Sequence, residues 1–157
     1  MKALAKKSDP FANFNFRVQF HHAKLGNIYC GFNFVSGIGV SSVFKEHREG
    51  GNNSTPDLIL ESISTHPVTM TKGMTVDESI YQLVSMMYKN ENGVIAPFKN
   101  RFDVSVQVMD RQQKSVVKQY QLKDCVVEQF ILGDMNSMGT EILMETVIIR
   151  FNEMDKI

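Results

Sequence analysis

Short segments in which apolar and polar residues alternate recur through most of this chain. In residues 14–20 and again in residues 102–108, every second side chain is apolar. Because successive side chains of a strand point to opposite faces, this period predicts strands that bury one face only. Further strand-like segments lie at residues 28–38, 40–46, 57–63, 67–73, 116–122 and 142–151. The sequence therefore predicts a mainly β protein, built as two packed antiparallel sheets or a small barrel-like domain.

Two of these segments support more detailed predictions. Residues 21–27 begin with His21-His22 and contain Gly26-Asn27, which predicts a turn from which residues 28–38 return as one continuous strand. Residues 123–132 are apolar on both faces, so this strand is expected to be covered on both sides. Its predicted faces carry Val126 with Phe130 and Val127 with Ile131.

One segment has the period of a helix instead. Its apolar residues are spaced i, i+4, i+7, i+8 and i+11, which places them on a single stripe. Thr75 and Glu78 have the spacing of a capping box and predict the helix start, and Asn92-Gly93 predicts its end. We expect this one helix to cover a face or an end of the sheets. The stripe consists of Val76, Ile80, Leu83, Val84 and Met87.

The stretch His47-Arg48-Glu49-Gly50-Gly51-Asn52-Asn53 separates two predicted strands and has no apolar face to bury. Adjacent glycines relax the steric limits on φ, and asparagines tolerate left-handed backbone. On composition alone the stretch is typical of a long hairpin turn. It also fits an extended loop, over residues 45–56, that lies flat against another surface.

Three blocks, in order along roughly the first third of the chain, resemble the tail tube protein family of contractile phage tails and contractile injection systems. The first runs from Asp9-Pro10-Phe11 to Val18, and the second is Gly31-Phe32-Asn33-Phe34-Val35-Ser36-Gly37-Ile38-Gly39. The third is Arg48-Glu49-Gly50-Gly51-Asn52-Asn53, with His47 where the family usually has Tyr. The family is related in fold to type VI secretion tube proteins.

Later parts of the chain keep this resemblance only in outline. Residues 67–73 end in Lys72-Gly73, as the corresponding family strand ends in a basic residue and Gly, but the lysines expected before it are absent. In the closing segment, Glu141 and Glu145 keep the spacing of two family acids, while Thr140 stands where the family has Asn.

The resemblance implies a structural subunit that forms hexameric rings, each joined by a β-barrel that spans the subunits. Rings would stack into a tube inside a sheath, meet baseplate, spike and tube-end proteins, and pass DNA or effector protein without sequence-specific binding. Residues 1–10 would form an arm. The implied inter-subunit contacts are His47, Arg48, Glu49, Gly50, Gly51, Asn52 and Asn53 in the loop, with Asp9, Phe11, Glu141 and Glu145 elsewhere.

Two alternatives stay open at this point. One is a tube-initiator or terminator ring protein at the baseplate or tube end, which shares the fold. The other belongs to a different class: a monomeric β-sandwich that uses its loop to bind a protein or glycan ligand. The state of assembly distinguishes this module from the two ring-forming functions.

Composition sets the outer bounds. The 157 residues are most simply one domain, and 17 basic residues balance 17 acidic ones, so no overall field attracts nucleic acid or anionic lipid. We see no apolar run of about 18 residues and no leader sequence. We therefore expect no signal peptide, no membrane binding and synthesis in the cytoplasm. The family resemblance implies that this is a host cytoplasm and that the final location is a virion tail or an injection particle.

Residues capable of catalysis or metal binding do not form a convincing set. His21, His22 and Cys30 lack a fourth ligand at zinc-site spacing. Cys125, drawn with His47 or His66, lies in a strand that looks buried, where a thiol is unreactive. Cys30 and Cys125 are expected as two buried thiols rather than a disulfide. We expect no enzyme activity, no cofactor and no metal.

Overall fold

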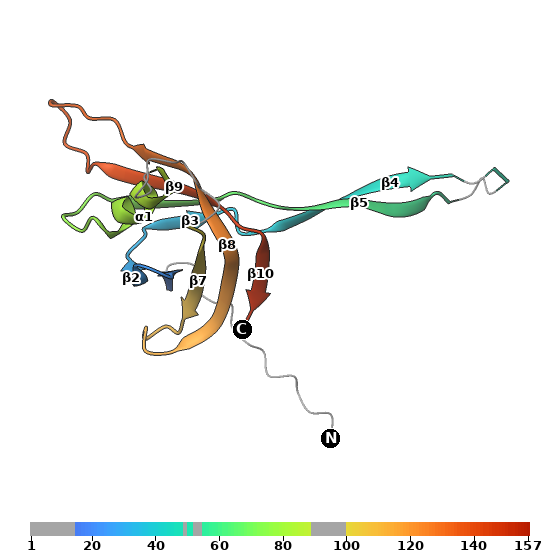
Figure 1. Cartoon of the computed structure of the whole chain (residues 1–157), viewed down its shortest axis with the longest axis horizontal. Helices are drawn as coiled ribbons and strands as arrows, with labels where there is room; N and C mark the ends of the chain where they lie inside the picture. Colours follow the sequence, from blue (N-terminus) through green and yellow to red (C-terminus); the bar gives the residue numbers. More distant parts are fainter. Residues whose placement is uncertain (1–14, 49, 52–54, 89–99) are drawn as a thin grey trace, which may run out of the picture.

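The computed structural model describes residues 15–48, 50–51, 55–88 and 100–157, which form ten strands and one helix (Figure 1). The prediction of a mainly β protein with one helix is confirmed. In chain order the elements are β1 Phe16–His22, β2 Gly26–Cys30, β3 Phe34–Ser36, β4 Val40–His47, β5 Asp57–Thr65, β6 Val68–Gly73, α1 Ser79–Tyr88, β7 Phe102–Met109, β8 Val116–Leu132, β9 Met144–Arg150 and β10 Glu153–Lys156.

All strand pairs are antiparallel, and most of the strands follow one hydrogen-bonded path in the order β2-β1-β7-β8-β9-β6-β3. The strand β8 is 17 residues long and is shared between two halves. It pairs with β7 up to Cys125 and with β9 from Val126 onward, while β10 pairs with its first half. The two halves are the two antiparallel sheets that the sequence predicts. In the described residues the path is open, since its end strands β2 and β3 do not pair with each other.

The prediction of one continuous strand over residues 28–38 is wrong. The strand β2 ends at Cys30 and pairs with β1, whereas β3 begins at Phe34 and pairs with β6 at the other end of the path. Between them Phe32 is buried in the core, with its ring centroid 6.0 Å from that of Phe20. Because the Phe32 ring is buried, the chain crosses here from the edge strand β2 to the edge strand β3 at the other end of the path. The histidines expected in a turn instead end β1, and the turn is residues 23–25.

The core lies between the two halves and under α1. Phe20 is at its centre, fully buried, with ring centroids 6.0 Å from Phe32 and 5.7 Å from Phe102. The helix contributes Ile80, Leu83 and Val84, as its apolar stripe predicts. Further buried residues of the cluster come from both halves: Ile28, Cys30, Val18, Val104, Val106, Leu122 and Cys125 from one, and Val68, Met70, Val147 and Ile149 from the other, with Phe151 just after β9.

The predicted helix start is wrong by one turn. Val76, expected on the apolar stripe, is fully exposed, and α1 begins only at Ser79. The Asp77 carboxylate accepts hydrogen bonds from the Ser79 backbone amide at 3.0 Å and from its hydroxyl at 2.5 Å. Asp77 therefore caps the helix in place of Thr75, because the Asp77 carboxylate lies closer to the first turn. The predicted stop at Asn92-Gly93 lies outside the described residues.

A bulge corrects the predicted faces of β8. The pairing with β9 shifts between Val127 and Gln129, so one extra residue stands in β8 there. This inverts the alternation, and Val127 and Phe130 both pack against the core instead of facing opposite ways. The Phe130 ring also meets Tyr81 of α1, with centroids 6.5 Å apart. Beyond it Ile131 remains half exposed, so the predicted cover on both sides is incomplete within the subunit.

This core generates a stability prediction. Phe20→Ala should destabilise the subunit by about 3–5 kcal/mol, because it leaves a cavity beside two other rings. Tyr29→Ala, on the neighbouring strand but 68% exposed, should change stability by about 0.5 kcal/mol or less. Urea denaturation followed by circular dichroism compares the two. Equal shifts would contradict the placement of Phe20 at the centre of the core.

Candidate assembly surfaces

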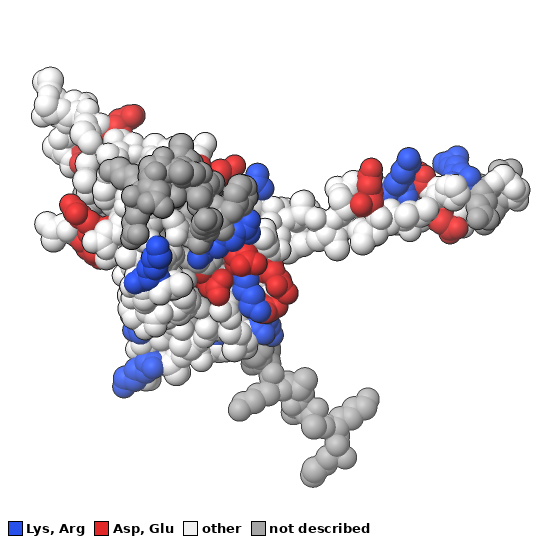
Figure 2. All heavy atoms as spheres, in the orientation of Figure 1, with Lys and Arg blue, Asp and Glu red and all other residues white. Residues whose placement is uncertain are grey.

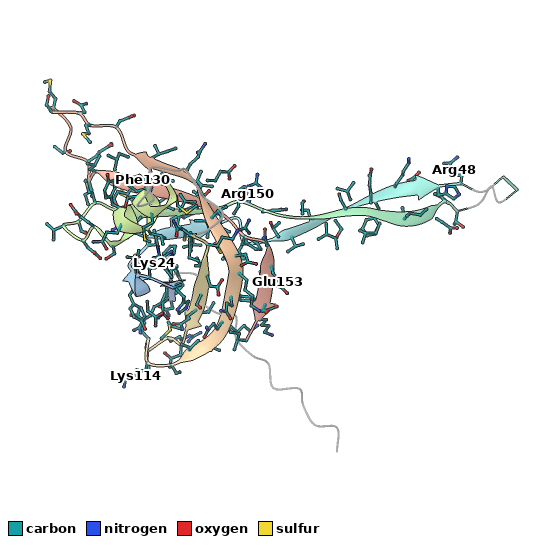
Figure 3. The ribbon with its side chains drawn as sticks, viewed as in Figure 1. Lys24, Arg48, Lys114, Phe130, Arg150 and Glu153 are labelled. Carbon is teal, nitrogen blue, oxygen red and sulfur yellow. The ribbon has the colours of Figure 1, made fainter. Side chains whose placement is uncertain are left out.

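The strands β4 and β5 form a long hairpin that leaves the body of the molecule (Figure 1). Within the described residues they pair only with each other, from Val40↔Thr65 to His47↔Asp57. Residues 45–47, expected in the extended loop, are part of this ladder and belong to β4. The glycines of the stretch lie at the tip of the hairpin. Figure 3 shows Arg48 near that tip.

The predicted contact residues of the stretch 47–53 are only partly described. His47 ends β4, Arg48 follows it, and both are exposed. Gly50 and Gly51 form an exposed turn, and Gly51 has a φ of 120°, a conformation that favours glycine. Glu49, Asn52 and Asn53 lie outside the described residues, as do Asp9 and Phe11 of the predicted arm.

The register gives the hairpin two different faces. Cross-strand partners share a face, and alternate residues along a strand return to it. A bulge between Val43 and Phe44 keeps Phe44 opposite Leu60. One side, named the apolar hairpin face, carries Val40, Phe44, Leu58, Leu60 and Ile63, each between 47% and 65% exposed, together with Ser42, Glu46 and Thr65. The opposite side carries Ser41, Lys45, His47, Asp57, Ser62 and Ser64, together with Val43 and Ile59.

The apolar hairpin face is unusual for a hairpin that pairs with no other described strand. A two-stranded hairpin is at best marginally stable alone in water, and an exposed apolar strand invites pairing with other chains. Sequence reasoning identified the tip but missed this face, because the bulge that aligns Phe44 with Leu60 leaves no simple alternation to read. Its position, far from the core, indicates a surface made for another molecule.

The base of the hairpin is anchored to the body. His66 N donates to the Gly39 carbonyl at 3.0 Å, the Thr65 hydroxyl donates to the Phe151 carbonyl at 2.6 Å, and Ser41 and His66 join through their side chains. Gly37 has a φ of 87°, and an added Cβ would lie 2.3 Å from the Pro67 carbonyl oxygen. Only glycine fits this close approach, so the hairpin leaves the body in a defined direction.

The two predicted acids of the closing segment have different surroundings. Glu141 is exposed on the connection between β8 and β9. Glu145 is buried in β9, opposite Lys72 of β6, and its carboxylate lies 3.6 Å from Lys72 Nζ. The two side chains are only 11% and 7% exposed. Glu145 thus forms an ion pair inside the subunit, whereas Glu141 is available to a neighbour.

The histidines make structural hydrogen bonds. His22 is buried, and its Nδ1 accepts from the backbone amides of Lys24 and Leu25 at 3.1 and 3.3 Å. Burial, with a smaller effect of the Lys24 charge, lowers the pKa of His22 below its usual value. The neighbouring His21 bonds Asn27 and Ser105 through its two ring nitrogens. Across the described part of the chain, no three potential metal ligands gather.

The two cysteines are free, buried thiols, as predicted. Burial raises the pKa of Cys30 to about 11 and that of Cys125 to about 12. Both therefore stay protonated at neutral pH, where a thiol is a poor nucleophile. Among the described residues, no helix is long and apolar enough to span a membrane.

The buried ion pair generates a second stability prediction. Lys72→Met leaves the Glu145 carboxylate buried without its cation, which should cost about 3–5 kcal/mol. Adding Glu145→Leu should recover most of this loss, because both charges are then removed together. Denaturation midpoints of the two variants test this. Lys123→Met, which breaks the exposed pair with Asp155, is the control and should shift the midpoint far less. A double variant no more stable than Lys72→Met would contradict the coupling.

Comparison with solved structures shows where this fold occurs. A chain in the six-fold symmetrised baseplate of the anti-feeding prophage matches with a TM-score of 0.84 at 17% identity, covering 96% of this chain and 97% of that one. A chain in the sheath–tube complex of the PVC extracellular contractile injection system, in the extended state, gives 0.77 at 12%, with 99% of each covered. A type six secretion system protein gives 0.53 at 15%, covering 90% and 82%.

A comparison with curated protein sequences finds no significant match. The model of one sequence family, described as T4-like virus tail tube protein gp19, matches residues 12–155. That span contains the hairpin, both half sheets and α1. The family resemblance read from the three sequence blocks is confirmed, and the chain belongs to the T4-like virus tail tube protein family.

Proposed function

We propose that this chain is the repeating subunit of the inner tube of a contractile tail or injection system. The observation that carries the proposal is the apolar hairpin face, which extends from the body without cover in a member of a tail tube family. Fully burying one Leu or Phe side chain contributes about 1.5–3 kcal/mol. Several half-exposed side chains of the apolar hairpin face would be buried against a neighbouring copy. Because this burial is repeated in every copy, it favours assembly strongly.

The open sheet path supports ring formation. Its terminal strands β2 and β3 end the path within the subunit, and an exposed strand edge is a template for pairing. Joining copies edge to edge in a closed ring removes such edges, as in a barrel. We assign a hexameric ring because the family resemblance implies it and because a similar chain comes from a six-fold symmetrised baseplate.

Within this tube the hairpin reaches a neighbouring copy. Its tip, with His47, Arg48, Glu49, Gly50, Gly51, Asn52 and Asn53, meets that copy, and the arm residues Asp9 and Phe11 and the exposed Glu141 make further contacts. The role is structural rather than enzymatic. Sheath, baseplate and tube-end proteins are the other partners, and DNA or effector protein passes through the lumen.

A ring that begins or ends the tube is the second candidate. The match to a chain in a baseplate structure has a higher TM-score than the match to a chain in a sheath–tube complex, 0.84 against 0.77. Negative-stain microscopy of the purified protein separates the two. A main tube subunit forms long hollow rods, whereas an initiator or terminator forms single rings. A monomer at every concentration, even with sheath and baseplate proteins added, would contradict both.

The two hairpin faces generate a prediction. Phe44→Glu together with Leu60→Glu places charge on the apolar hairpin face and should abolish rings and rods while leaving the folded subunit intact. Ser62→Glu together with Ser64→Glu adds the same charges to the opposite face and is the matched control, which should still assemble. Sedimentation velocity and microscopy give the readout, and circular dichroism checks the fold. Normal rods from the first variant would remove the apolar face from assembly.

A further inference from the structure

A second exposed apolar surface lies where β8 ends, away from the hairpin (Figure 1). It is formed by the last residues of β8, the β8–β9 loop (residues 133–143), the β6–α1 connection (residues 74–78) and the first turn of α1. The loop and the connection are joined, because Met74 N donates to the Leu143 carbonyl at 2.8 Å. We name this the acidic apolar surface. Its apolar side chains, between 41% and 100% exposed, are Met74, Val76, Tyr81, Ile131, Leu132, Met135, Met138 and Ile142.

The charged residues of this surface are all acids. Figure 2 shows white and red atoms, but no blue ones, where the β8–β9 loop projects at the upper left. The nearby Lys72 is buried and already paired with Glu145, at 3.6 Å. A basic partner therefore meets uncompensated carboxylates here. Residues 74–81 and 131–144 contain no Lys or Arg, and their acids are Asp77, Glu78, Asp134 and Glu141.

The β8–β9 loop also encloses a hollow. Residues 133–144 line a space of about 1020 Å³, which is as large as a pocket for a drug-sized ligand and can admit the side chains of a short peptide. An exposed apolar patch rimmed by polar residues is typical of a contact site. Methionine suits such a site, because its flexible side chain adapts to the partner that covers it.

The sequence before β1 contains a segment of matching chemistry. Residues 1–8 carry Lys2, Lys6 and Lys7 and no acid, and their apolar residues include Met1 and Leu4. The surface and this segment are thus opposite in charge, and both present unbranched or aliphatic side chains. Opposite charges select the partner and its orientation, while apolar side chains supply the area to be buried.

This segment is tethered on a suitable side of the body. The Asn15 carbonyl accepts from Met109 N at 2.8 Å, and the Asn15 side-chain amide donates to the Asp110 carbonyl at 3.3 Å, which fixes Asn15 beside the β7–β8 turn (residues 110–115). Because β8 curves, this turn and the β8–β9 loop project from the same side of the body (Figure 1). Leu4 precedes Asn15 by 11 residues, so an extended connection would let it reach about 35–40 Å from Asn15.

We propose that, in the dispersed subunit, residues 1–8 dock on the acidic apolar surface of their own chain, with Leu4 in the hollow and the lysines at its acidic rim. Tethering favours this contact, because a short connection holds the segment at an effective concentration of about millimolar. Docking covers apolar side chains that are otherwise open to other copies, and so protects the free subunit from non-specific association. The inference concerns the single subunit, so it stands or fails separately from the proposed tube.

Disulfide trapping tests the docking. Leu4→Cys combined with Met135→Cys or with Met138→Cys should form an intrachain disulfide when the dilute subunit is oxidised mildly at pH 8, in a yield that does not depend on protein concentration. Leu4→Cys with Leu58→Cys, on the hairpin and 65% exposed, is the matched control and should form none. The native thiols stay silent, because burial raises their pKa to about 11 and about 12. Interchain disulfides alone, or no disulfide with either pair, would overturn the proposal.

Charge reversal gives an independent readout. In the trapping variant, Lys6→Glu with Lys7→Glu should slow disulfide formation about tenfold, because like charges then face each other. Adding Asp134→Lys with Glu141→Lys should restore the rate, and salt of about 0.5 M should slow the original pair by screening. Thermal melting checks that each variant folds. An unchanged rate after the first reversal, or no recovery after the second, would contradict the assigned contact.

Discussion

Backbone pairing along both edges of β8 is the interaction on which the rest of this structure depends. One edge pairs with β7, and the other pairs with β10 and then β9. Among the described residues, the hydrogen-bonded path from one half sheet to the other passes through this strand, so its hydrogen bonds help to hold the two sides of the core together. A bulge after Val127 changes which side chains face inward, and it brings Phe130 under α1.

The second constraint is the surface that this core does not bury. The hairpin is rooted by the close approach of Gly37 to Pro67 and by hydrogen bonds at residues 65 and 66. Beyond that root, its strands pair only with each other among the described residues. The core of the body lies away from the hairpin, so in the proposed tube the apolar hairpin face is covered by a neighbouring copy. Folding of the subunit buries the core, and in the proposed tube assembly buries the hairpin surface.

Much of the fold could be predicted from the sequence, because alternation of apolar residues reports directly on half-buried strands. The stripe through Ile80, Leu83 and Val84 likewise identified the helix and its buried face. Tertiary packing determined the strand boundaries and the helix start that the apolar pattern did not predict. Burial of Phe32 split one predicted strand into two that lie at opposite edges, and Asp77 replaced Thr75 at the start of α1.

The candidate contact residues show the same limit. Composition located the hairpin tip, since glycine and asparagine report on turns, but the apolar face depends on a register that no single strand reveals. Glu141 and Glu145 have the same spacing in the sequence as two family acids, yet Lys72 occupies the carboxylate of Glu145 within the subunit. Spacing alone does not tell a buried ion pair from an exposed contact, because both use the same residue types.

Hydrogen exchange measured by mass spectrometry tests the central claim most directly, by comparing dispersed subunits with the assembled protein. The relevant peptides cover β4 and β5, with peptides from β7 as the internal reference. The account predicts that hairpin amides exchange rapidly in the dispersed subunit and become strongly protected on assembly, while β7 is protected in both. Hairpin amides that exchange at the same rate in the two states would contradict it, because the apolar hairpin face would then gain no cover from a neighbour.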